Sequence, residues 1–148
     1  SDTCEFFIKT NIGEVLKPLA KIASGGEISR IMLAIKLALQ NSDTVDTLIF
    51  DEIDSGISGA TAEKVGYKIN QLGKSHQVLC ISHLSQIAGM GNSHYKVSKQ
   101  ISHGRTTVSI NKLNKEKRIN EIASLISGKN LTESSMRQAK HLIERNYG

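Results

Sequence analysis

The chain has 148 residues, of which 39% are apolar, and it contains a single proline. This length and composition are typical of one globular domain with a real core. No apolar run is long enough to span a bilayer and no signal-peptide pattern opens the chain, so we expect no membrane partner. The chain begins with Ser1 rather than Met, which indicates a segment excised from a longer protein.

The cysteines and the charges give two further expectations. Cys4 and Cys80 lie in apolar, strand-like runs far apart in the sequence, which favours buried free thiols in a reducing, cytoplasmic compartment. The net charge is +5, but residues 1–95 carry 8 Lys/Arg against 10 Asp/Glu and residues 96–148 carry 11 against 4. A basic C-terminal third indicates an anionic partner such as nucleic acid, and the alternative is a solvated basic surface.

The first part of the chain predicts a strand, a loop and a helix. Residues 4–10 form an apolar run typical of a strand, and residues 11–23 form a loop. From Ser24 to Leu39, apolar residues recur at helical spacing. Ser24 is followed three residues later by Glu27, which is a capping-box pattern, so we expect the helix to begin beside Ser24.

The middle of the chain predicts a βαβ unit. Residues 47–50 are apolar or β-branched and hydrophobic on both faces, which is typical of a strand buried in a parallel sheet. A helix is expected at residues 58–72 and a second strand at residues 77–83. The crossover between them sets the two strands parallel.

The C-terminal third completes an α/β fold. Its expected elements are a short helix at 84–88, a hairpin of strands at 94–100 and 106–113, and helices at 115–126 and 132–146 separated by Gly128. We find no internal repeat and no linker, so residues 1–148 are expected to form a single partial domain.

Two acidic residues, Asp51 and Glu52, come directly after the first strand of the βαβ unit. Ligands of open α/β sheets bind outside the carboxyl ends of the strands. In a phosphate site, Asp51 would hold Mg²⁺ through water and Glu52 would orient or deprotonate an attacking water. His83 ends the neighbouring strand and could donate a hydrogen bond to a terminal phosphate. The alternative is a pair of solvated acids and a structural histidine.

The run Ser24-Gly25-Gly26-Glu27 opens the first predicted helix. Glycines let backbone N–H groups approach an anion, and a helix N-terminus adds unsatisfied donors and a positive dipole end. The pattern therefore favours phosphate binding, and the alternative is a plain capped helix. Residues 73–75 look like the end of a phosphate loop, but Lys68 stands where a glycine is required, so the chain has no Walker A motif. The remaining histidines show no zinc-ligand spacing with the cysteines.

Taken together, these motifs resemble the C-terminal half of an ABC-type P-loop ATPase head of the SMC class. The matching stretches are residues 23–30 (signature motif), 48–52 (Walker B), 54–58 (D-loop) and 81–83 (switch histidine). The resemblance covers nearly the whole chain and is strongest for a bacterial branch that acts in recombinational repair of DNA double-strand breaks. Ser82 and Ser85 depart from it, since the family often has Thr and Pro there.

The resemblance implies a Mg-dependent ATPase in which two heads of a homodimer sandwich ATP. It implies the N-terminal half of the head, with Walker A and the Q-loop, as a further partner, and DNA as another. This chain alone would be inactive, and the whole protein would be associated with the nucleoid. The resemblance assigns nucleotide binding to Ser24, Gly25, Gly26, Glu27 and Asp54, Mg²⁺ to Asp51, and catalysis to Glu52 and His83.

Two other functions stay open. A metal-dependent nuclease or Toprim-like domain would use Asp51, Glu52 and Asp54 on DNA without a nucleotide, and it would give the helix cap at Ser24 no role. A non-enzymatic DNA-binding module would depend on residues 96–148 and bind DNA with a steep salt dependence. The second of these is compatible with an ATPase.

Overall fold

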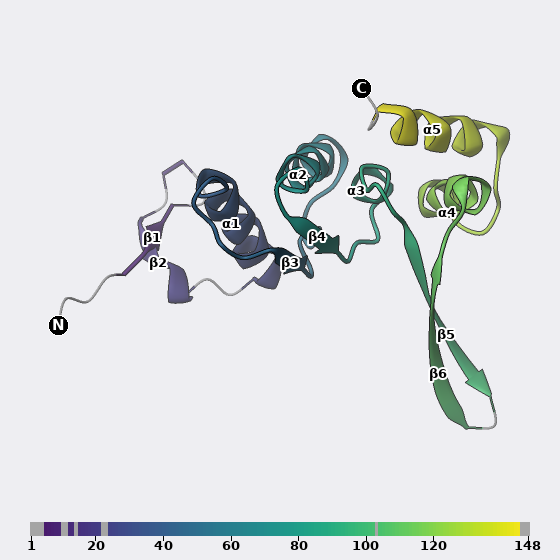
Figure 1. Cartoon of the computed structure of the whole chain (residues 1–148), viewed down its shortest axis with the longest axis horizontal. Coiled ribbons are helices and arrows are strands. Elements are labelled where there is room, and N and C mark those ends of the chain that lie inside the picture. The colour runs from purple at the N-terminus through teal and green to yellow at the C-terminus, as the bar shows by residue number, and fades with distance from the viewer. Residues whose placement is uncertain (1–4, 10–11, 14, 22–23, 103, 146–148) are drawn as a thin grey trace. The chain divides into compact units, whose positions relative to one another are not determined.

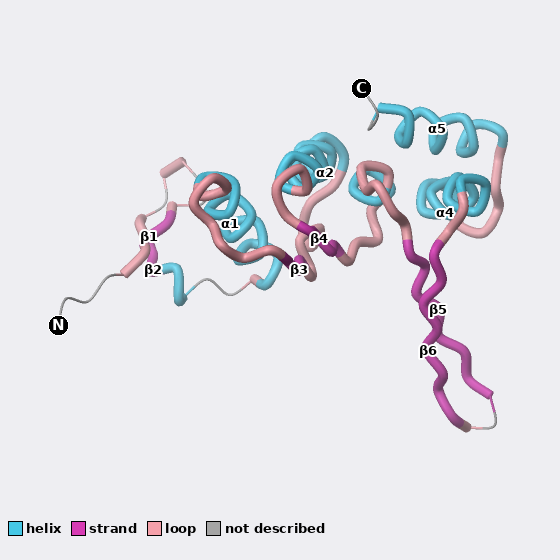
Figure 2. The backbone as a smooth tube through the Cα atoms, in the orientation of Figure 1, coloured by secondary structure: helices cyan, strands magenta, loops and turns pink. Residues whose placement is uncertain are grey.

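The structure is a computed structural model that describes residues 5–9, 12–13, 15–21, 24–102 and 104–145. The chain contains both helices and strands in mixed order, which confirms the α/β class (Figures 1 and 2). The chain divides into two compact units, one of residues 1–57 and 72–82 and the other of residues 58–71 and 83–148. The single partial domain stays a prediction.

The first unit opens with two very short strands, β1 (Phe7–Ile8) and β2 (Lys17–Pro18), which pair antiparallel. The strand expected at residues 4–10 is thus only two residues long, and Cys4 and Thr10 lie outside the described residues. The expected loop contains β2, because the backbone of Lys17 and Pro18 finds a partner strand there.

A 3-10 turn, Leu19–Lys21, precedes α1 (Gly25–Ala38), and Ala23 lies outside the described residues. The helix begins where the sequence predicts, since the Ser24 hydroxyl accepts a hydrogen bond from the Glu27 N–H at 3.4 Å. This bond satisfies one of the donors that a helix start leaves without a partner.

Strands β3 (Thr47–Phe50) and β4 (Gln77–Cys80) are parallel neighbours, and the chain between them contains α2 (Gly59–Leu72). This pairing confirms the predicted parallel arrangement of the two strands. The sequence predicts that the first strand is buried on both faces, and this prediction is wrong. Leu48 and Phe50 are buried, whereas Ile49 is 70% exposed. Within the described part of the chain this sheet has two strands, and Ile49 lies on its exposed face.

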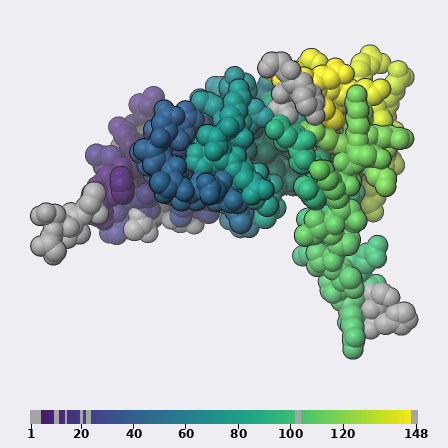
Figure 3. Space-filling view, in the orientation of Figure 1, coloured from purple at the N-terminus to yellow at the C-terminus, as the bar shows by residue number. Residues whose placement is uncertain are grey.

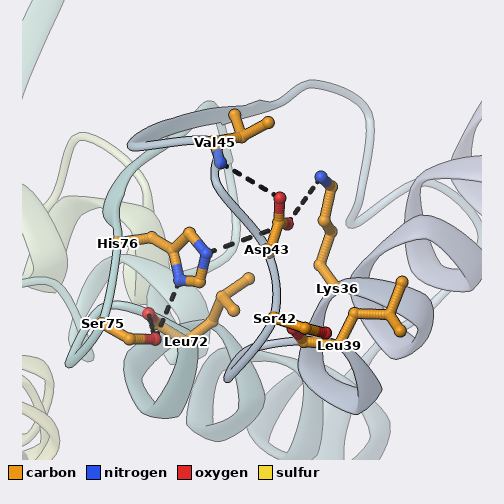
Figure 4. A network of polar contacts seen from close by, with 8 residues as sticks. All are labelled: Lys36, Leu39, Ser42, Asp43, Val45, Leu72, Ser75 and His76. Carbon is orange, nitrogen blue, oxygen red and sulfur yellow. Dashed lines mark hydrogen bonds and ion pairs between the residues drawn. The ribbon is translucent and has the colours of Figure 1, made fainter.

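A polar network around Asp43 ties the end of α1 to the starts of β3 and β4 (Figure 4). The Asp43 carboxylate accepts a hydrogen bond from Lys36 Nζ at 2.7 Å and one from the Val45 N–H at 3.1 Å. His76 Nε2 lies 3.8 Å from the same carboxylate, and its Nδ1 is 2.8 Å from Ser75 Oγ. The hydrogen bond from Lys36 is the main cause that lowers the pKa of Asp43, and the backbone bond from Val45 is the next largest.

Cys80 is a half-buried free thiol in β4, as the sequence predicts for it. Its pKa is raised to about 12, mainly by burial and to a smaller extent by the carboxylates of Asp54 and Asp51. The thiol is therefore protonated at neutral pH and is a poor nucleophile.

In the second unit, α3 (Ser85–Ala88) precedes a hairpin of β5 (Tyr95–Ser102) and β6 (Arg105–Lys112). The predicted hairpin is confirmed, with strand ends that differ from the expected ones by one or two residues, and His103 lies outside the described residues. The ribbon projects from the helices of this unit as a narrow arm (Figures 1 and 3).

Helices α4 (Lys115–Ser127) and α5 (Glu133–Glu144) form the core of the second unit. Gly128 ends α4 with a φ of 75°, a conformation that favours glycine. The two helices pack through Ile122, Ala123, Ala139, Leu142 and Ile143. Among the described residues, no helix is both long and apolar enough to cross a membrane.

Candidate functional site

The start of α1 packs tightly against the loop that follows β3. Gly26 is buried, and a Cβ added there would lie 2.8 Å from the Ser55 Cβ and 2.9 Å from the Glu52 carbonyl oxygen. These distances are shorter than van der Waals contact, so only glycine fits this position without movement of the loop. The predicted glycine-rich helix start and the predicted acidic loop are therefore in direct contact.

The acidic loop has a strained conformation at Glu52. Its φ is 56°, in the left-handed region, which costs a non-glycine residue about 1–2 kcal/mol. The Asp51 carboxylate supports this turn, since its Oδ1 accepts a hydrogen bond from the Glu52 N–H at 2.9 Å. Strain of this kind is retained where the surroundings hold it in place, and such places are often functional.

The Glu52 carboxylate lies directly over the first residue of α1. A Cβ added at Gly25 would be 2.3 Å from Glu52 Oε2. A carboxylate is stabilised at this position because a helix N-terminus carries a partial positive charge. Glu52 thus occupies the kind of anion site that the glycine-rich run predicts.

Two side chains from the first turns of α1 hold the acidic loop. Ser29 Oγ donates to the Asp51 carbonyl oxygen at 2.7 Å. Arg30 Nη1 donates to the carbonyl oxygens of Ile53, at 3.2 Å, and Ser55, at 2.8 Å. The sequence motifs predict no role for these two side chains. Their partners are backbone carbonyls, which leave no pattern in the sequence.

Asp54 is buried in the first unit, and its Oδ2 accepts a hydrogen bond from Ser82 Oγ at 2.7 Å. Ser82 follows β4, so this bond connects the two loops at the carboxyl ends of the parallel strands. The bond brings the loop after β3 and the loop after β4 together at this edge of the sheet.

The predicted site residues fall into two groups. Those of the first unit lie at the start of α1 and in the loop after β3: Ser24, Gly25, Gly26, Glu27, Asp51, Glu52 and Asp54. His83 belongs to the second unit, where it is exposed, and its place beside the carboxylates stays a prediction. In the described parts of the chain, no three His, Cys, Asp or Glu side chains come together to hold a metal ion.

The fold of the chain is similar to that of a solved structure. The chain has the fold of a solved structure from work on the "structural biochemistry of ATP-driven dimerization and DNA stimulated activation of SMC ATPases". The match has a TM-score of 0.55, covers 88% of this chain and 77% of the other, and has 23% sequence identity. The chain therefore has an SMC-ATPase type of fold.

The chain is also similar in sequence to curated proteins. The chain is 47% identical over 143 residues to the DNA repair protein RecN of Halalkalibacterium halodurans, with 97% of this chain and 25% of that protein covered. It is 43% identical to RecN of Bacillus subtilis and 46% identical to RecN of Vibrio cholerae, over 97% and 96% of this chain and 25% and 26% of those proteins. The chain is therefore similar to RecN proteins over nearly its whole length, and it spans about a quarter of the length of these relatives. No family model matches it.

Proposed function

We propose that the chain is the C-terminal part of an ATPase head in an SMC-like protein that acts in recombinational repair of DNA double-strand breaks. The observation that carries this proposal is the contact between Gly25 and Glu52, which brings a helix N-terminus and an acidic loop together. The similarity to RecN proteins and to the SMC-ATPase fold supports it.

In the proposed mechanism, the start of α1 binds a phosphate of ATP held by the opposite head of a homodimer. Ser24, Gly25 and Gly26 offer N–H donors and a hydroxyl there, beside Glu27. The Glu52 carboxylate now lies over this helix start, and a phosphate seated there displaces it. Because Glu52 is exposed, its side chain can then turn to orient or deprotonate the attacking water.

Asp51 is the residue that would hold Mg²⁺. Its carboxylate is exposed, and Mg²⁺ binds one or two carboxylates and keeps water and phosphate oxygens as its other ligands. A single carboxylate therefore fits such an ion. The ion would neutralise charge on the phosphates. His83 would contact the terminal phosphate, and Asp54 would couple the two sites of the dimer.

An exposed apolar face on the parallel pair is suited to the N-terminal half of the head. Ile49 and Leu79 are paired across β3 and β4, and both are exposed, as is Ile81 just beyond β4. Apolar side chains side by side on a two-stranded sheet favour a covering element. We assign that role to the half-head that carries Walker A and the Q-loop. The complete protein would work in the cytoplasm, at the nucleoid.

The nuclease or Toprim-like alternative requires three carboxylates that converge on a metal ion. Asp54 is instead buried and bonded to Ser82, and Glu52 lies over Gly25. The arrangement of the described residues therefore favours the ATPase.

The test is the Glu52→Gln substitution in this chain combined with the N-terminal half of its head. Hydrolysis of ATP is expected to fall by at least about 100-fold, because a general base contributes roughly that much, whereas ATP binding is retained. Glu133→Gln, an exposed glutamate on α5, is the matched control and should leave turnover unchanged. Unchanged turnover in Glu52→Gln would exclude Glu52 as the base.

A further inference from the structure

The second unit contains a basic pocket at the base of the hairpin that the proposed ATPase does not use. Its volume is about 280 Å³, and four of the residues that line it are His94, Lys112, Lys115 and Arg118. The pocket lies where β6 runs into the N-terminus of α4. The Leu113 N–H closes the hairpin base by donating to the His94 carbonyl oxygen at 2.8 Å.

Arg118 is a buried cation in the wall of this pocket. It is 6% exposed, and its Nη2 donates to the carbonyl oxygens of Gly89 and Gly91. Within the described part of the chain, no carboxylate pairs with it, and its Nε has no hydrogen-bond partner. A buried charge without a counter-charge is costly, so an anion beside this guanidinium would be stabilised.

His94 provides a second unpartnered group in the same pocket. Its Nδ1 is buried and finds no hydrogen-bond partner among the described residues. The pKa of His94 is lowered mainly by burial and to a smaller extent by the Arg118 cation. Lys96 acts in the same direction and Glu121 in the opposite one. Glu121 is already paired with Lys96, so the surroundings of His94 stay predominantly cationic.

Two exposed lysine side chains add positive charge to this pocket. Lys115 is the first residue of α4, where the helix end itself favours an anion. Lys112 ends β6, with its Nζ 5.9 Å from the centre of the Tyr95 ring. A phosphate group has several acceptor oxygens and can bind more than one of these cations at once.

We propose that this pocket binds a single phosphate group, carried by the DNA backbone or by a small phosphorylated molecule. The charge of the second unit favours DNA, since residues 58–71 and 83–148 contain 13 Lys/Arg and 5 Asp/Glu. The site is separate from the start of α1, and it does not depend on the ATPase assignment.

The experiment uses the 148-residue chain and a matched pair of double variants. Lys112→Gln/Lys115→Gln removes two charges from the pocket, whereas Lys129→Gln/Lys140→Gln removes two exposed charges of the same unit outside it. Arg118 is left intact because it holds two backbone carbonyls. Duplex DNA binding is measured by fluorescence anisotropy at several salt concentrations. Binding of inorganic phosphate is followed by the NMR signals of the His94 ring.

The pocket variant is expected to bind DNA about tenfold more weakly, because charge-assisted hydrogen bonds are lost. The slope of the logarithm of its DNA-binding constant against the logarithm of the salt concentration should become shallower by about one unit, as expected for the loss of one phosphate contact. The control variant should change much less. In the unmodified chain, phosphate should shift the His94 signals to saturation, and the pocket variant should not respond.

The two arms separate the sources of the phosphate. A DNA effect confined to the pocket variant identifies the backbone, with or without a response to free phosphate. A phosphate response with equal DNA binding by both variants identifies a small phosphorylated ligand. Equal DNA binding by both variants together with unresponsive His94 signals would overturn the proposal.

Discussion

The two units of this chain are stabilised in different ways. In the second, Ile122, Ala123 and Ala139 are fully buried between α4 and α5, so this unit has an apolar core of its own. In the first, the helix start and the acidic loop are held by side-chain bonds to backbone carbonyls, and Ile49 and Leu79 stay exposed. The first unit also buries Ile53 and Leu72 completely, so the contrast concerns the candidate site, which is held by polar contacts, and not the presence of a core.

The largest expected effect is in the second unit. Ile122→Ala should lower the free energy of unfolding by about 2–5 kcal/mol, because it leaves a cavity in a closed core. Ile110→Ala, on the hairpin, is the control and should have little effect, since that side chain is 67% exposed. Denaturant unfolding followed by circular dichroism measures both. Equal destabilisation by the two variants would contradict the location of the core.

The polar support of the first unit gives the next effect. Arg30→Met keeps most of the side-chain volume but removes the bonds to the carbonyls of Ile53 and Ser55, and should cost about 1–3 kcal/mol. Arg137→Met is the control, because Arg137 forms only an exposed pair with Glu133 in the same helix. If hydrogen exchange of the loop backbone is the same in both variants, Arg30 does not hold the loop.

The two glycines at the start of α1 should respond differently to alanine. Gly26→Ala forces a methyl group against the Glu52 carbonyl oxygen and Ser55, and overpacking of this kind costs about 1–3 kcal/mol. Gly25→Ala meets only the end of the flexible Glu52 side chain, which can move aside. Thermal unfolding of both variants tests this, and a more destabilising Gly25→Ala would show that the loop packs differently.

The smallest expected effect concerns pH. The pKa of Asp43 is lower in the folded chain than its ordinary value of 3.8, so its ionised form stabilises the fold. That contribution is complete above pH 3.8 and is lost as the pH falls toward the folded pKa. The stability difference between the unmodified chain and Asp43→Asn should therefore shrink with acid below pH 3.8. A difference independent of pH in this range would exclude the proposed linkage.

The sequence predicts those parts of the fold that follow from local rules. The cap at Ser24, the parallel pairing of residues 47–50 and 77–80, the hairpin and the stop at Gly128 all correspond to patterns of periodicity or turn chemistry. Strand β2 has no such pattern, because two residues cannot show a period. The exposure of Ile49 depends on how many strands the sheet has, which its own neighbours in the sequence do not encode.

The sequence predicts the residues of the candidate site but not the contacts between them. The positions of Gly25 and Glu52 are evident from the sequence, whereas the contact between them depends on the left-handed φ of Glu52. The basic pocket was missed because His94 and Arg118 are far apart in the chain and form no ligand motif. Only the folded hairpin base brings them together.

If the chain carries one part of a composite ATPase site, it needs its other half for activity. We would test this by measuring the rate of ATP hydrolysis by the 148-residue chain alone and after addition of the N-terminal half of its head. We expect negligible hydrolysis by the chain alone and Mg-dependent hydrolysis once the N-terminal half is added. Equal hydrolysis with and without that half, or none in either case while both parts are folded and associated, would contradict the claim.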